Sequence, residues 1–142
     1  MIAAVNEIME KHKTNCPCKL CSKLGIRIKN LDLPSNIRGL CVVSNAKRYI
    51  LINSSIESHV DRCVVMAHEL GHALLHSDCV IQASTRGNSE GMHEYQANLF
   101  AAHLLTGGKD IPCHLKKEFR RCSHNADRTH NLLVRLSFNC YM

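Results

Sequence analysis

The sequence is poor in aromatic residues and contains no long apolar run. None of its 142 residues is Trp, and aromatics make up only 4%, so the core must be mainly aliphatic. No segment approaches the roughly 20 apolar residues that a membrane-spanning helix requires. The first residues, Met1–Lys13, carry acidic and basic side chains where a signal peptide would have an apolar segment. We therefore expect a cytoplasmic protein without a membrane segment.

Internal repeats, low-complexity tracts and linkers are also missing. Apolar residues make up 45% of the chain and charged residues 21%, which fits a globular protein and excludes a long disordered tract. A chain of this length can bury a sufficient core without disulfides or other cross-links. We therefore predict a single domain over residues 1–142.

Cysteine, in contrast, is frequent, with nine residues. Because no export signal is seen and the cytosol keeps thiols reduced, we expect free thiols in place of disulfides. Cys16, Cys18 and Cys21 lie close enough in sequence to suggest a second metal site. A closed zinc site needs four ligands, however, and Cys41 is the one further donor that suggests itself. Three reduced thiols in a short helix are the simpler interpretation.

The formal charge is +6, which favours an acidic partner or nucleic acid without distinguishing between them. No RRM, KH or zinc-finger signature is present, so direct binding of nucleic acid is not expected. Lys116, Lys117, Arg120 and Arg121 form a basic cluster on a predicted helix. This cluster is either a docking patch for an acidic partner or an ordinary solvated face.

The spacing of apolar residues divides the chain into helices around a few short strands. Helical periodicity predicts helices at Met1–Lys13, Pro17–Gly25, Ile56–His76, Ser89–Leu105, Pro112–Arg121 and Asn125–Phe138. Stretches rich in β-branched residues predict strands at Ile26–Ile28, Gly39–Val43 and Arg48–Ile52. Ser77–Ser89 is polar and irregular. This order indicates an α+β domain in which a small antiparallel sheet packs against helices.

The strongest local signal is the segment His68–His72, which has the H-E-x-x-H pattern of zinc peptidases. Residues four apart lie one turn apart on a helix face, so His68 and His72 can both reach one Zn²⁺ ion. Glu69 then lies beside the ion and can act as general base towards the attacking water. The residues on both sides of the motif are apolar, as a buried site requires, and this context argues against a chance match.

A catalytic zinc ion needs a third protein ligand, and Glu94 is the best candidate. It begins the second strong helix, where Ala97 and Ala101 on the same face allow a close approach to the first. Asn98, one turn later, can orient a ligand. Spacing alone explains Glu94 equally well as a solvated charge near a helix start.

Two histidines are rivals of Glu94 for the third position. His76 continues the row from His72, but three ligands along one straight helix spread over about 12 Å, too far for one ion. We expect His76 to be a capping group or a partner of a ligand. His93 points about 100° away from Glu94 on a helix, so the two cannot easily bind together.

The two segments His68–His76 and Glu94–Ala102 together resemble the ImmA/IrrE metallopeptidase family, and the likeness extends over nearly the whole chain. The resemblance implies a minimal, gluzincin-like zinc fold with Glu94 as third ligand. It also implies a role known from phages and mobile elements, the proteolytic inactivation of a helix-turn-helix repressor. Some relatives carry their own helix-turn-helix domain, and the length of this chain leads us to expect a repressor encoded nearby.

Two hypotheses of different class follow. The first is a zinc endopeptidase that cuts a regulatory protein, and the second is an anti-repressor that binds its partner without cutting. An intact Glu69 favours the first, because a structural zinc site needs no base. An extended substrate would pair with an open strand edge, and Arg48–Asn53 is either such an edge or a plain core strand. Four residues remain open as helpers at the carbonyl oxygen: Tyr95, His93, His124 and Arg128.

Overall fold

The computed structural model describes residues 1–76 and 90–141, and the polar segment predicted for Ser77–Ser89 lies outside the described residues. The helices are α1 (Ile2–His12), α2 (Pro17–Lys23), α3 (His59–Leu75), α4 (Glu90–Leu105), α5 (Cys113–Arg121) and α6 (Ala126–Tyr141). The strands are β1 (Arg27–Leu31), β2 (Gly39–Ser44) and β3 (Lys47–Asn53). The predicted α+β class is therefore correct, and each element lies close to its predicted position.

Local sequence explains several of the helix boundaries. Pro17 occupies the first turn of α2, where its missing N–H leaves no hydrogen bond unmade. Ser58 caps α3, its hydroxyl accepting a hydrogen bond from the backbone N–H of Asp61. The left-handed residues Gly107 and Gly108 follow the end of α4.

The sheet is mixed, which corrects the prediction of an antiparallel sheet. Its strand order is β1-β3-β2, with β2 antiparallel and β1 parallel to β3. The antiparallel pair follows from the two-residue turn Asn45-Ala46, whose positive φ angles suit a tight hairpin. Residues 32–38 carry the chain past the position of β3 before β2 begins, so β1 and β3 run in the same direction.

This topology also decides between the two interpretations of Arg48–Asn53, as an open edge for a substrate or as a core strand. These residues belong to β3, which pairs on both sides and is the central strand. Among the described strands, the edges of the sheet are β1 and β2. An added strand would therefore have to pair with one of these two.

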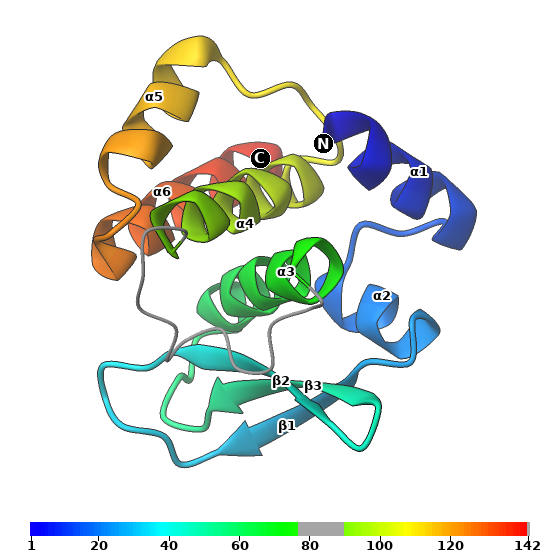
Figure 1. Cartoon of the computed structure of the whole chain (residues 1–142). Helices are drawn as coiled ribbons and strands as arrows, with labels where there is room; N and C mark the ends of the chain where they lie inside the picture. Colours follow the sequence, from blue (N-terminus) through cyan, green and yellow to red (C-terminus); the bar gives the residue numbers. More distant parts are fainter. Residues whose placement is uncertain (77–89, 142) are drawn as a thin grey trace.

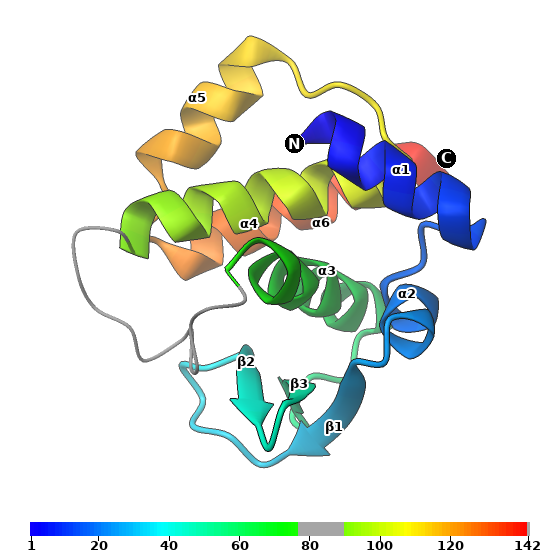
Figure 2. The ribbon, with the colours of Figure 1, turned by 45° about the vertical axis from the view of Figure 1, so that its right-hand side comes forward.

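The elements form layers over one face of the sheet. Figures 1 and 2 show α3 lying across the sheet, with α4 and α6 packed on the far side of α3. One cluster of buried apolar side chains joins these layers, including Ile50 and Ile52 from the sheet, Leu70 from α3 and Phe100 from α4. As the composition requires, this core is mainly aliphatic.

Helices α3 and α4 approach closely at one point. A Cβ atom added to Gly71 would lie 3.1 Å from the carbonyl oxygen of Ala97 and 3.2 Å from the Cβ of Phe100. Ala97 and Ala101 are themselves fully buried. The small residues therefore bring the two helix backbones together, and this contact explains a glycine in the middle of α3.

Candidate metal centre

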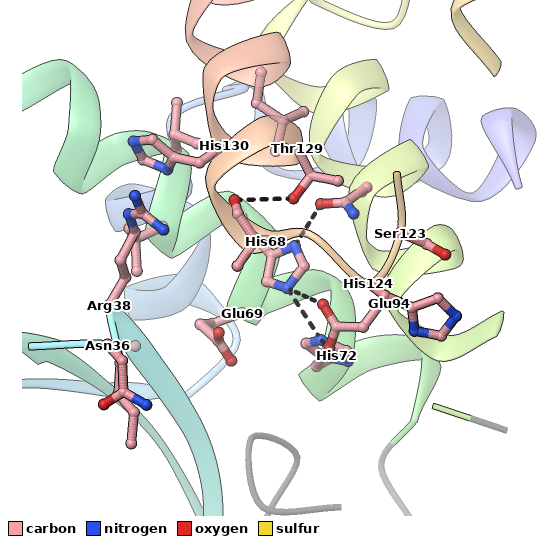
Figure 3. A pocket seen from close by; sticks show the side chains of 17 residues that line it. Asn36, Arg38, His68, Glu69, His72, Glu94, Ser123, His124, Thr129 and His130 are labelled. Carbon is pink, nitrogen blue, oxygen red and sulfur yellow. Dashed lines mark hydrogen bonds and ion pairs between the residues drawn. The ribbon is translucent and has the colours of Figure 1, made fainter. Parts of the chain in front are cut away.

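The close approach of α3 and α4 brings His68, His72 and Glu94 together. The two Nε2 atoms of the histidines lie 3.2 Å apart. Glu94 faces both rings, with Oε2 3.1 Å from His68 Nε2 and Oε1 2.9 Å from His72 Nε2. Figure 3 shows the three side chains converging on one point. We call these residues the His-His-Glu group.

The geometry of this group fits a tetrahedral metal ion. Two ligand atoms held about 2.0–2.1 Å from a tetrahedral zinc ion lie about 3.3 Å from each other. The ligand atoms here all lie within 4.8 Å of one another, and the facing pairs are close to the tetrahedral value. Two imidazoles and one carboxylate are also the donor set of a catalytic zinc site that leaves a position open for water.

The neighbours of the two histidines fix which ring nitrogen carries a proton. His68 Nδ1 lies 2.8 Å from Asn98 Oδ1, and because an amide oxygen accepts, Nδ1 must donate. Gln96 Oε1, 2.8 Å from His76 Nε2, places the proton of His76 on that nitrogen. His76 Nδ1 then accepts from His72 Nδ1 at 3.1 Å. When both histidine rings are neutral, each therefore keeps an Nε2 lone pair available to a cation.

Glu69 lies beside the His-His-Glu group but does not belong to it. Its side chain is buried, and its Oε2 has no hydrogen-bond partner among the described residues. Gly39 at the start of β2 covers it, since a Cβ there would lie 3.2 Å from the Glu69 Cγ. A buried carboxylate oxygen without a partner is a group placed to receive a proton or a hydrogen bond from a bound molecule.

The pKa values of these groups describe the metal-free state. Burial raises the pKa of Glu69 to about 7, with the charge of His68 acting against this shift. Burial lowers the pKa of His72 to about 4. For His68 burial also favours the neutral form, but the hydrogen bond and charge of Glu94 outweigh it and raise the pKa to about 9. Glu94 itself stays ionised, because its two histidine partners more than offset burial and hold its pKa well below the usual range.

A pocket of about 330 Å³ opens in front of the His-His-Glu group. Residues 36–39 form one wall of this pocket, and residues from the α5–α6 corner and from α6 form another. Figure 3 labels several of the polar side chains that line these walls: Asn36, Arg38, Ser123, His124, Thr129 and His130. Most of these were not singled out by sequence reasoning, because no local motif marks residues that long-range packing brings to a site.

The rival histidines lie away from the convergence point. The ring of His93 stacks on that of His76 with their centroids 4.0 Å apart. His76 lies at the C-cap of α3 and contacts His72, as expected of a capping group or a partner of a ligand. Neither side chain belongs to a group whose ligand atoms could share one ion with others among the described residues.

The three N-terminal cysteines and the basic cluster do not line the pocket of this site. Cys16 is partly buried, Cys18 is exposed and Cys21 is buried, and all three are free thiols. The basic residues on α5 are partly neutralised by neighbouring groups. Arg121 lies 3.4 Å from Glu118, and Lys116 lies 3.6 Å from Asp110.

Fold and site together define a small α+β protein of the metallopeptidase-like class. The chain belongs to the Peptidase_M78 family, whose model, described as the IrrE N-terminal-like domain, matches residues 21–112. This confirms the resemblance found from the sequence. The matched range contains the H-E-x-x-H segment and Glu94.

A phage protein is also similar to this chain. It is the uncharacterized immunity region protein 2 of Bacillus phage phi105, 34% identical over 105 residues. The match covers 72% of this chain and 66% of the phage protein, slightly less than two thirds of its length. No solved structure matches the chain. None of the helices in the described ranges is both long and apolar enough to cross a membrane.

Proposed function

We propose that this protein is a zinc-dependent endopeptidase with a gluzincin-like site. His68, His72 and Glu94 would hold the ion, and Glu69 would act as the general base. The single observation that carries this proposal is the convergence of two imidazole Nε2 atoms and one carboxylate within 4.8 Å, beside a buried carboxylate that is not part of the group. A purely structural zinc site would need four protein ligands and no such base.

The residues divide the chemistry among them. When bound, zinc would supply a Lewis acid that makes a water acidic and polarises the substrate carbonyl. Glu69 takes a proton from the attacking water and passes it to the leaving amine as the C–N bond breaks. The surroundings of Glu69 support this role, because its buried Oε2 has no hydrogen-bond partner among the described residues and is therefore free to take up a proton.

The sheet offers a place for an extended substrate. Strand β2 lies at an edge, and in an antiparallel pair every second residue of β2 turns its N–H and C=O away from β3. Gly39, at the start of β2, lines the pocket together with Glu69. A peptide that pairs with this edge would bring one of its carbonyl groups towards Glu69. We therefore assign substrate pairing to Gly39–Ser44 in place of the central strand.

The proposed substrate is a helix-turn-helix repressor encoded nearby. Membership of the family and the similarity to a phage immunity-region protein support this assignment. A folded helical domain cannot pair with β2, so the cut is expected in an accessible loop, linker or frayed helix end. Residues 1–142 would act as one domain in the cytoplasm, a location supported by the free thiols of the described cysteines.

The test is to mix purified protein, zinc and the neighbouring repressor, and to map the products by mass spectrometry. Wild type should produce one or a few defined cuts. Glu69→Gln keeps the size and hydrogen-bonding capacity of the side chain but cannot take up a proton, so cleavage should fall at least about 10²-fold with zinc content unchanged. An uncut repressor under these conditions would contradict the substrate assignment.

The same variant separates cleavage from binding. A non-cutting anti-repressor would act by holding its partner, so Glu69→Gln would relieve repression in cells as well as wild type does. A peptidase would lose this effect. Glu57→Gln is a matched control, since Glu57 is exposed and does not line the site pocket.

A further inference from the structure

We propose that His124 is a further catalytic residue, which donates a hydrogen bond from its imidazole to the carbonyl oxygen of the scissile peptide bond. This inference rests on the proposed peptidase function. When water attacks the carbonyl carbon, a C–O bond forms and an electron pair moves onto the carbonyl oxygen. A donor placed at that oxygen lowers the barrier. Glu69 cannot be this donor, because it is occupied in carrying the proton from the water to the amine.

The position of His124 suits the role. Figure 3 shows Glu69 on one side of the His-His-Glu group and His124 on the other. Both residues line the same pocket. A carboxylate repels negative charge that develops nearby, so a donor to the carbonyl oxygen belongs on the side away from Glu69.

The structure separates the four candidates that the sequence left open. His124 lines the pocket, whereas the described lining does not include the other three. Each of those three is engaged elsewhere. Their contacts are Tyr95 beneath the Arg120 guanidinium at 5.8 Å, His93 stacked on His76 at 4.0 Å, and Arg128 paired with Glu118 at 2.7 Å.

Four of the other potential donors that line the pocket are already paired. Their partners are Asp127 at 2.6 Å from Arg38, Asp61 at 2.7 Å from His130, the Arg120 carbonyl oxygen at 3.2 Å from Ser123, and the Ala126 carbonyl oxygen at 3.1 Å from Thr129. Asn36, Arg38 and His130 lie on the same side as Glu69 in Figure 3. The remaining donor, Asn98 Nδ2, has no partner among the described residues, but Asn98 is buried behind His68, with its Oδ1 2.8 Å from His68 Nδ1. His124 is exposed to solvent and makes no such hydrogen bond or ion pair with the described residues, so its ring is available to a substrate.

A glycine in α4 makes room for this ring. A Cβ atom on Gly91 would lie 2.8 Å from Cε1 and 3.0 Å from Nε2 of His124. Gly91 precedes Glu94 by about one helical turn, so the ring rests on the face of α4 that carries Glu94. The absence of a side chain at Gly91 therefore allows His124 to lie close to the His-His-Glu group.

The experiment compares four proteins on the mapped cleavage site: wild type, His124→Ala, His124→Gln and Gly91→Ala. His114→Ala is the matched control, because His114 is also exposed and lies outside the pocket lining. The measurements are kcat and KM, bound zinc, and the affinity for a phosphonamidate peptide built on the cleaved sequence. The phosphoryl oxygen of this peptide stands in for the charged carbonyl oxygen. The cleavage product serves as an uncharged reference ligand.

His124→Ala should lower kcat by about 10²-fold and leave KM and bound zinc near the wild-type values. Affinity for the phosphonamidate should fall by a similar factor while affinity for the product stays unchanged. His124→Gln, which keeps an N–H donor, should recover part of both losses. Gly91→Ala should weaken phosphonamidate binding because its methyl group displaces the ring.

Two results would overturn the inference while the peptidase function stands. One is a kcat and a phosphonamidate affinity for His124→Ala within about twofold of His114→Ala, well below the loss expected for one donor. The other is loss of zinc from His124→Ala, which would make His124 a support of the metal site. A wild-type protein that cuts nothing would instead overturn the proposed function, and this inference with it.

Discussion

The two sides of the pocket are built by different means. On one side, α3 and α4 hold the His-His-Glu group through buried helix contacts at Gly71 and Ala97. On the other side, residues 36–39 meet the start of α6 through polar contacts, of which the Arg38–Asp127 pair at 2.6 Å is exposed. Buried helix packing fixes positions closely, whereas an exposed ion pair stabilises by about 1 kcal/mol or less. The difference suggests a rigid metal site facing a more adaptable substrate wall.

The largest expected effect concerns the metal side. Glu94→Ala should weaken zinc binding by more than 100-fold, because it removes a proposed ligand and leaves two. Asn98→Ala should weaken it by about 10–100-fold, because it removes the hydrogen-bond acceptor that orients His68. His93→Ala is the control and should stay within a few-fold of wild type. Competition titrations with a zinc chelator measure all three.

A reversed order of zinc affinities among these variants would contradict the proposed ligands. If His93→Ala released the metal and Glu94→Ala retained it, the ligand assignment would be wrong. The two variants should differ clearly in zinc affinity, since His93 contacts His76 whereas Glu94 contacts both proposed histidine ligands.

The second prediction tests the packing that holds the metal side together. In an ordinary helix, replacing glycine with alanine stabilises by about 1 kcal/mol. At Gly71 the added methyl group would press against Ala97 and Phe100, so Gly71→Ala should instead destabilise by about 1–3 kcal/mol. Urea denaturation of the metal-free proteins measures whether the free energy of unfolding of Gly71→Ala lies below or above that of wild type. A more stable variant would show that the close approach of α3 and α4 is not needed.

The smallest predicted effect concerns the substrate side, where His130 on α6 bonds to Asp61 on α3. Burial lowers the pKa of His130, despite the hydrogen bond to Asp61 that opposes this shift. As pH falls through the unfolded-state pKa of about 6.5, the unfolded chain gains a proton before the folded one does. Stability from this group is therefore lost on acidification.

His130→Gln removes that titration and should lose less stability than wild type between pH 7.5 and pH 5.5. Urea midpoints of the metal-free proteins at the two pH values provide the comparison. An equal loss in both proteins would mean that His130 does not contribute to the pH dependence. Asp127→Ala, which breaks an exposed pair without a histidine, is the control.

The contrast between the metal side and the substrate side of the pocket also explains which features could be predicted from the sequence. The spacing of His68, Glu69 and His72 follows from helix geometry alone, so the motif was visible without a fold. Gly71 lies in the middle of the predicted helix Ile56–His76, where glycine costs stability, and the contact with Ala97 supplies a packing reason for it. Such features depend on residues a turn apart or on two helices packed face to face.

The pairing of strands and the substrate wall depend on contacts distant in sequence. The parallel pairing of β1 with β3 is set by the path of residues 32–38, for which no short pattern exists. For this reason the sequence left open whether Arg48–Asn53 is an edge or a core strand, and the structure makes it the central strand. His124 was one of four equal candidates until the pocket lining distinguished it. In both cases the outcome depends on long-range packing, which the local spacing of residues does not reveal.

The most direct test of the central claim is X-ray absorption at the zinc edge, combined with elemental analysis of the same sample. The account predicts one zinc ion per chain, bound by nitrogen and oxygen atoms at about 2.0–2.1 Å, with two imidazoles and no sulfur. This is the signature of His68, His72 and Glu94 with a water. A shell of sulfur atoms at about 2.3 Å would place the ion on cysteines such as Cys16, Cys18 and Cys21, and would contradict the proposed site.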